Sequence, residues 1–152
     1  MAKSKTGPPT PVTQSASADP DWQGGMVFQG WVSVAAWMAV GLLLEGLLGY
    51  KIPAYLDDPQ RRELFRLAHT HGAFLGLVVI VYALSAGRLG DKVPASARRA
   101  LRIGAVAMPL GFFLAGVWHP EGDPGPAIWL VPPAGLLLIY GVISAALAHA
   151  RK

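Results

Sequence analysis

Apolar positions in this chain gather into four long segments, each of a length suited to crossing a lipid bilayer. The segments run over about residues 26–50, 64–86, 100–118 and 127–148. A hydrocarbon core about 30 Å thick requires roughly 20 apolar residues in helical conformation. The pattern therefore predicts an all-α, polytopic integral membrane protein, with a bundle of four transmembrane helices formed by residues 26–150.

The first 25 residues differ in kind from the rest. They are rich in Pro, Ser, Thr, Gly and Ala and show no apolar periodicity, which is typical of a disordered tail. No short apolar segment with a cleavage site precedes the first span, so the tail does not resemble a secretory signal. We expect the first span to act as an uncleaved signal anchor.

Composition supports a membrane location and narrows the chemistry. The chain has 152 residues, of which 53% are hydrophobic and only 14% charged, whereas soluble domains carry about 25% charged residues. The absence of cysteine excludes disulfides, thiolate metal sites, covalent attachment of c-type haem and a cysteine nucleophile. The net charge of +4 does not indicate nucleic acid as a partner, because the basic residues lie in loops and tails, where membrane topology explains them.

The positions of Lys and Arg predict how the helices are oriented. Four antiparallel spans put both termini and the loop between spans two and three on one side, here called side A, and the other two loops on side B. Of the 13 Lys and Arg residues, only Lys51, Arg61, Arg62 and Arg66 belong to side B. The positive-inside rule then makes side A cytoplasmic. We expect both termini on the cytoplasmic face of a membrane, most simply a bacterial inner membrane.

Small residues recur at helical spacing in three of the spans. The stripes are Ala68, Gly72 and Gly76 in span two, Gly104, Ala107, Gly111 and Ala115 in span three, and Gly141 and Ala145 in span four. Lipid gives helices no hydrophobic reason to associate, so small residues that allow close approach mark packing faces. The stripes predict either contacts within the bundle or contacts with a partner membrane protein or a second copy of the chain.

Glu45 is the only ionisable residue of the first span, and it lies about one turn inside its side-B end. An ionised carboxylate is costly within a bilayer, so Glu45 should find a partner. One interpretation is that it reaches the interface and pairs with Lys51 or an arginine of the same loop. The other is that it faces a histidine and serves as a ligand or a proton-transfer group.

His69 and His71 stand near the start of span two. A separation of two residues turns about 200° on a helix, so the two rings should point to nearly opposite sides and cannot bind one metal ion on a regular helix. His69 shares the side of Gly72 and Gly76, which makes it the better internal candidate. The alternative is that both are interfacial and bonded to carbonyl groups and water.

His119 lies at the side-B end of span three, and together with Glu45 and one of His69 or His71 it would converge beneath the side-B surface. Two histidines and a carboxylate suit iron, copper or zinc. Two histidines from different helices, with His69 and His119 as candidates, would also suit axial ligation of a b-type haem. The candidate metal ligands are therefore Glu45, His69, His71 and His119.

One stretch carries a resemblance to a known family. Its residues are Ile52-Pro53, Asp58-Pro59, and His69 or His71 followed by Gly72. They resemble small four-span membrane proteins of the hydroxylaminobenzene mutase type, which have a proline after span one, an Asn-Pro in the loop and a histidine at the entry to span two. Here Asp58 replaces the asparagine, and the glutamate of the family's His-Leu-Glu-Gly run is missing. The resemblance implies an isomerase that moves a hydroxyl group on an arylhydroxylamine, with His71 and Glu45 as proton-transfer candidates.

Three classes of function follow. The first is a subunit or accessory protein of a membrane complex, which the small size, the small-residue stripes and the sparse polar content favour. The second is a protein that binds a metal or haem near the extracytoplasmic face. The third is a small membrane isomerase of the mutase type.

Overall fold

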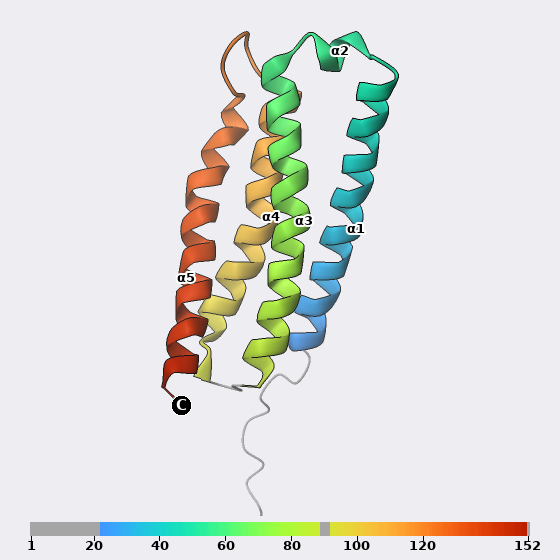
Figure 1. Cartoon of the computed structure of the whole chain (residues 1–152). Helices are drawn as coiled ribbons and strands as arrows, with labels where there is room; N and C mark the ends of the chain where they lie inside the picture. The colour runs from blue at the N-terminus through green and yellow to red at the C-terminus, as the bar shows by residue number, and fades with distance from the viewer. Residues whose placement is uncertain (1–21, 89–91, 152) are drawn as a thin grey trace, which may run out of the picture.

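The computed structural model describes residues 22–88 and 92–151 and consists of helices joined by short loops (Figure 1). The long helices are α1 (Trp22–Gly49), α3 (Pro59–Gly87), α4 (Ala95–Val117) and α5 (Val131–Ala150), and the short ones are α2 (Pro53–Leu56) and the 3-10 helix η2 (Pro126–Leu130). Four helical segments, the last made of η2 and α5, are long and apolar enough to span a membrane. The predicted all-α class with four membrane-spanning helices is confirmed, and the chain is an integral membrane protein.

Three long helices begin earlier than their apolar segments. They start at Trp22, Pro59 and Ala95, whereas the apolar pattern placed the starts near residues 26, 64 and 100. Hydropathy marks only the part of a helix that lies in hydrocarbon, and polar first turns extend beyond it. Residues 22–25 therefore belong to α1, and the rest of the predicted tail, residues 1–21, lies outside the described residues.

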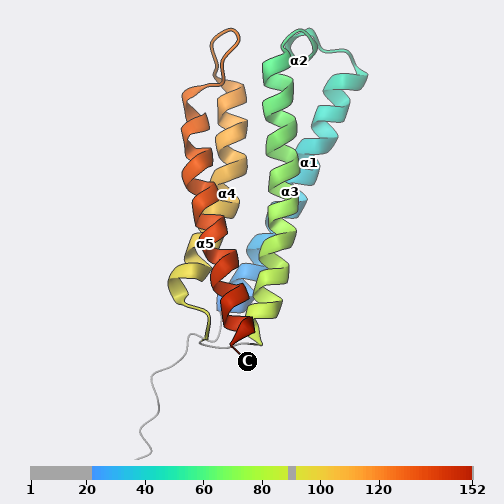
Figure 2. The same cartoon turned by 60° about the vertical axis from the view of Figure 1, so that its left-hand side comes forward.

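The helices form an open row in which α3 packs between α1 and α4, and α5 packs on α4 (Figures 1 and 2). The start of α1, the end of α3, the start of α4 and the end of α5 lie together at one end. The corner containing α2 and the loop of residues 118–125 lie at the other end. This arrangement confirms the grouping of the loops into side A and side B.

Close packing of the row depends on the predicted small-residue stripes. A Cβ atom at Gly76 would lie 2.8 Å from Val34 Cγ2 and 2.9 Å from the carbonyl oxygen of Gly30, and one at Gly104 would lie 2.7 Å from the carbonyl oxygen of Ala134. These glycines let α1 approach α3 and α5 approach α4. These stripes thus form contacts between helices of the same chain. A partner protein would have to bind at a different surface.

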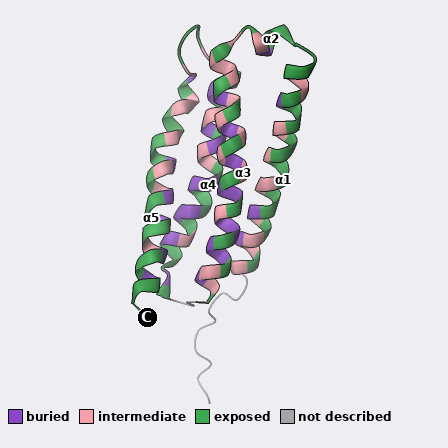
Figure 3. Ribbon diagram, in the orientation of Figure 1, coloured by how far each residue is buried: buried purple, intermediate pink, exposed green. Residues whose placement is uncertain are grey.

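The buried core lies mainly toward side A, where α3, α4 and α5 converge (Figure 3). Val79, Tyr82, Leu101 and Val93 are among its members. Helix α1 is the least buried of the four: Met26, Gly30 and Leu44 are its only buried residues. The main cluster of buried residues does not extend to the side-B end, where polar contacts also join the helix ends.

Candidate functional site

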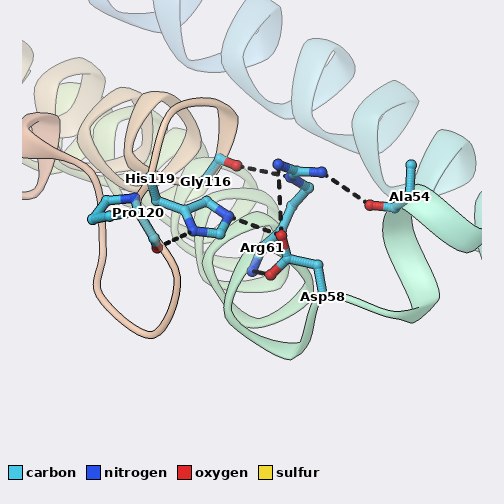
Figure 4. Close-up of polar contacts among 6 residues, drawn as sticks. All are labelled: Ala54, Asp58, Arg61, Gly116, His119 and Pro120. Atoms are coloured by element: carbon cyan, nitrogen blue, oxygen red, sulfur yellow. Dashed lines mark hydrogen bonds and ion pairs between the residues drawn. The ribbon is translucent and has the colours of Figure 1, made fainter.

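Asp58 connects the start of α3 to the end of α4 on side B (Figure 4). As the N-cap residue of α3, its Oδ1 accepts a hydrogen bond of 2.9 Å from the backbone N–H of Arg61. Its Oδ2 lies 3.0 Å from His119 Nε2 and 3.5 Å from Arg61 Nη2. One carboxylate therefore caps a helix and makes two charged contacts, one of them with a residue from a neighbouring helix end.

The guanidinium of Arg61 extends the same network to α2 and α4. Its Nε donates to the carbonyl oxygen of Gly116 at 3.1 Å, and its Nη1 donates to that of Ala54 at 3.0 Å (Figure 4). The planar fork of arginine suits several acceptors at fixed angles. The Arg61 side chain thus joins three helices at the side-B surface.

His119 completes the network from the end of α4. Its side chain is only 6% exposed, and its Nδ1 donates to the carbonyl oxygen of Pro120 at 2.9 Å. The other ring nitrogen, Nε2, faces Asp58 Oδ2, and this contact is an ion pair when both ring nitrogens carry a proton. We call Asp58, Arg61 and His119 the side-B clasp.

The clasp keeps Asp58 ionised. The hydrogen bond from the Arg61 backbone N–H lowers the pKa of Asp58 below its ordinary value of 3.8, and the charges of His119 and Arg61 add to this effect. Burial acts in the opposite direction but is outweighed. The clasp is therefore built around a stable negative charge at neutral pH.

His69 and His71 contact different helices. His69 Nδ1 lies 2.6 Å from the carbonyl oxygen of Trp37, and its ring packs against Gly41, so it faces α1. The ring of His71 lies 5.0 Å from that of Phe112, so it faces α4. The prediction that the two rings point to nearly opposite sides is confirmed.

The predicted convergence of Glu45, His119 and one of His69 or His71 is not found in the part of the chain that the structure describes. Across residues 22–88 and 92–151, no group of three or more His, Asp or Glu side chains is placed to hold a metal ion. Glu45 shares a groove with His69, His71 packs against Phe112, and His119 contacts Asp58. The individual candidates for metal or haem binding stay predictions, but they do not form one centre.

The groove that contains Glu45 and His69 lies between α1 and α3 near side B and has a volume of about 740 Å³. Arg62 and Arg66 line it together with apolar residues of α1. The ion pairs of the described residues do not include Glu45, so the expected pairing with Lys51 is not seen. The groove places Glu45 on the same side as His69 and also as Arg62 and Arg66, so it is compatible with both interpretations.

A second groove, here called the α1–α4 cleft, opens between α1 and α4 and has a volume of about 610 Å³. Its walls include Val32 of α1 and Val106 of α4, and Trp37 and Phe113, whose ring centroids are 6.0 Å apart, lie at its inner side. The walls are mainly apolar. Their polar residues are Gln29, Ser33 and Arg102, and Arg102 Nε donates to Gln29 Oε1 at 2.7 Å between the two helices. The cleft exists because α5 packs on α4 and does not close the row against α1.

Sequence reasoning missed Asp58 and Arg61 as members of the side-B network. The sequence did contain a signal for Asp58, because an Asp that precedes a Pro and a polar first turn is typical of a helix N-cap. His119 was identified, but as a metal candidate.

Comparison of the chain with protein-family models, curated proteins and solved structures found no match.

Proposed function

We propose that this chain is a subunit or accessory protein of a membrane complex, and that it holds a transmembrane helix of its partner in the α1–α4 cleft. The observation that carries the proposal is the cleft itself. One face of α1 packs on α3 through Gly30 and Gly76. A second face borders the cleft, and α4 on the far side covers it only in part, since Phe28 and Val32 stay 72% and 49% exposed. The partner's helix would cover the exposed part of that face.

The residues of α1 that line the cleft have the spacing of a helix-packing face. They are Gly25, Phe28, Gln29, Val32, Ser33, Ala36, Trp37 and Val40. Steps of three and four residues place them on one stripe about 22 Å long, at 1.5 Å per residue. Gly25, Ser33 and Ala36 are small, which permits the close approach that drives helix association in lipid. The stripe matches the length over which two transmembrane helices pack.

Several polar side chains of the described residues are engaged in contacts within the chain. Each of the four histidines has its Nδ1 bonded to a backbone carbonyl oxygen: His69 to Trp37, His71 to Leu67, His119 to Pro120 and His149 to Ala145. Such bonds fix ring orientation and stabilise the fold. The Asp58 carboxylate and the Arg61 guanidinium are likewise engaged in the side-B clasp. The polar side chains near side B thus serve largely to fasten helices.

The proposal includes the orientation of the chain in the membrane. Arg88, Lys92, Arg98, Arg99 and Arg151 lie at the side-A end of the row. Positive residues in short loops are retained on the cytoplasmic side. Both termini would then be cytoplasmic, in a bacterial inner membrane, and the side-B clasp would be extracytoplasmic.

Affinity purification from native membranes in a mild detergent tests the proposal. The Val32→Trp, Val106→Trp pair fills the cleft, because both valines line it and are about half exposed (49% and 42%). The matched control is the Leu136→Trp, Ile139→Trp pair on the exposed face of α5. We expect one other membrane-spanning protein to co-purify in a fixed ratio with the parent and the control, and to be lost from the cleft variant.

Three results would contradict the proposal: no membrane protein in fixed ratio with the folded parent chain, the same partner retained by the cleft variant, or only a second copy of this chain. Circular dichroism of both variants checks that the helices remain intact.

A further inference from the structure

A third groove runs along α4 beside the α1–α4 cleft, and it combines an apolar floor with a positively charged end. Its volume is about 610 Å³. Ile103, Ala107 and Leu114 of α4 and Leu130 of η2 form apolar parts of its lining, and Arg99 and Arg102 lie at its side-A end. It is separated from the α1–α4 cleft by the ridge of α4 that carries Val106.

The positive charge at this end is not neutralised within the described part of the chain. Arg98 turns away from the groove and lies 4.4 Å from the ring centroid of Trp22. Arg102 donates from Nε to Gln29 Oε1 at 2.7 Å, and Gln29 is uncharged. Arg99 is exposed and takes part in none of the hydrogen bonds or ion pairs of the described side chains, and no acidic residue lines the groove. An anion is the complementary ligand.

The length of the groove indicates what is attached to that anion. Arg99 to Leu114 spans about 22 Å of helix at 1.5 Å per residue, more than the roughly 15 Å of one leaflet of a 30 Å hydrocarbon core. A ligand that follows it would have a charged head at Arg99 and Arg102 and a long apolar tail. Basic pockets beside the ends of transmembrane helices bind anionic lipid head groups in this way.

We propose that this groove binds an anionic phospholipid of the side-A leaflet, with the head group on Arg99 and Arg102 and an acyl chain along Ile103, Ala107 and Leu114. A zwitterionic phospholipid has the same acyl chains but no net charge. The site should therefore bind the anionic phospholipid more tightly than the zwitterionic one. The lipid site and the α1–α4 cleft have Arg102 in common, whereas Arg99, Ile103, Ala107 and Leu114 line only the lipid groove.

Native mass spectrometry of the detergent-solubilised full chain, titrated with phosphatidylglycerol or phosphatidylcholine, tests this proposal. We expect tighter binding of phosphatidylglycerol. At about 1 kcal/mol for each arginine near the head group, the Arg99→Gln, Arg102→Gln variant should bind phosphatidylglycerol about 30-fold more weakly, and Arg99→Gln alone about fivefold more weakly.

Two control variants distinguish binding in this groove from a general attraction of anionic lipid to the positive charges of side A. The Arg88→Gln, Lys92→Gln variant removes the same number of side-A charges from outside the groove and should keep the preference. Gln29→Ala breaks the contact with Arg102 but leaves its charge, and it should also keep the preference. Equal binding of the two lipids by the parent, an unchanged affinity in Arg99→Gln, or an equal loss in the Arg88, Lys92 control would each overturn the proposal.

Discussion

Asp58 Oδ2 lies 3.0 Å from His119 Nε2, and this contact joins the first residue before α3 to the second residue after α4. It lies at the end of the molecule where the buried core thins. Helix ends that are not held by apolar packing fray more readily. The side-B clasp therefore stabilises the end of the row that packing leaves weakest.

Replacing Asp58 should reveal its two contributions separately. Asp58→Ala removes both the cap on the Arg61 N–H and the charge facing His119, and we expect it to lower the free energy of unfolding by about 2 kcal/mol. Asp58→Asn retains an oxygen for the cap and removes the charge, so its cost should stay near 1 kcal/mol or below, because the side chain is one-quarter exposed. Unfolding in detergent, followed by tryptophan fluorescence, measures both. Equal stability of Asp58→Ala and the parent would refute a structural role for the clasp.

The stability supplied by Asp58 should depend on pH in one direction. Its folded-state pKa is lowered below 3.8 by the Arg61 N–H and by the charges of His119 and Arg61. A group with a depressed folded pKa stabilises the protein above its unfolded pKa and loses this effect as pH falls through the folded pKa. The difference in unfolding temperature between the parent and Asp58→Asn should thus be fully developed at about pH 5 and shrink below pH 4. A difference that grows on acidification would contradict the assignment.

Gly76 should tolerate no larger side chain. Its Cβ position lies 2.8 Å from Val34 Cγ2 and 2.9 Å from the Gly30 carbonyl, so Gly76→Leu would force α1 away from α3 at a cost of at least about 2 kcal/mol. Gly46 is the matched control, because nothing lies within 4 Å of its Cβ position. Comparing the unfolding temperatures of Gly76→Leu and Gly46→Leu measures the effect. Equal losses in the two variants would mean that α1 does not pack on α3 through this glycine.

The absence of cysteine makes the proposed orientation simple to test. Single cysteines at Lys92 and Glu121 report side A and side B, respectively, and both positions are exposed. A membrane-impermeant maleimide added to intact cells, with an outer membrane opened beforehand where one is present, should label Glu121→Cys and spare Lys92→Cys until the inner membrane is also permeabilised. The reverse pattern would invert the orientation and place the side-B clasp in the cytoplasm.

Much of the architecture was predictable because crossing a bilayer imposes length and apolarity. The four spans, the grouping of their ends and the use of Gly72 and Gly76 as a helix-packing face follow from such constraints, whereas the choice between a neighbour in the same chain and one in another chain does not. The opposed directions of His69 and His71 follow from helix geometry alone. These features need no knowledge of which helix packs against which.

The pairing of side chains across helices was not predictable in the same way. In a membrane both lipid and neighbouring helices are apolar, so a helix such as α1 shows no polar face that fixes its rotation about its own axis. The row was therefore predicted as a plain bundle, and the open α1–α4 cleft was missed. The contact of His119 with Asp58 depends on how far α3 and α4 are shifted relative to each other along their axes. The pattern of apolar residues does not determine this shift.

The resemblance to mutase-type proteins stays a prediction. Its two proton-transfer candidates lie in different surroundings, since Glu45 lines the groove between α1 and α3 and His71 packs on Phe112 of α4. An isomerase mechanism that uses both residues would have to bring them to one substrate.

The most direct test of the account is site-specific photo-crosslinking in native membranes. A photoreactive amino acid at Val32 projects into the α1–α4 cleft, and the same probe at Leu136, which is 69% exposed on α5, is the control. The account predicts one discrete adduct with a different membrane-spanning protein from position 32, absent from position 136 and abolished by Val106→Trp. Adducts with lipid alone at position 32, with a second copy of this chain, or with the same protein from both positions would contradict it.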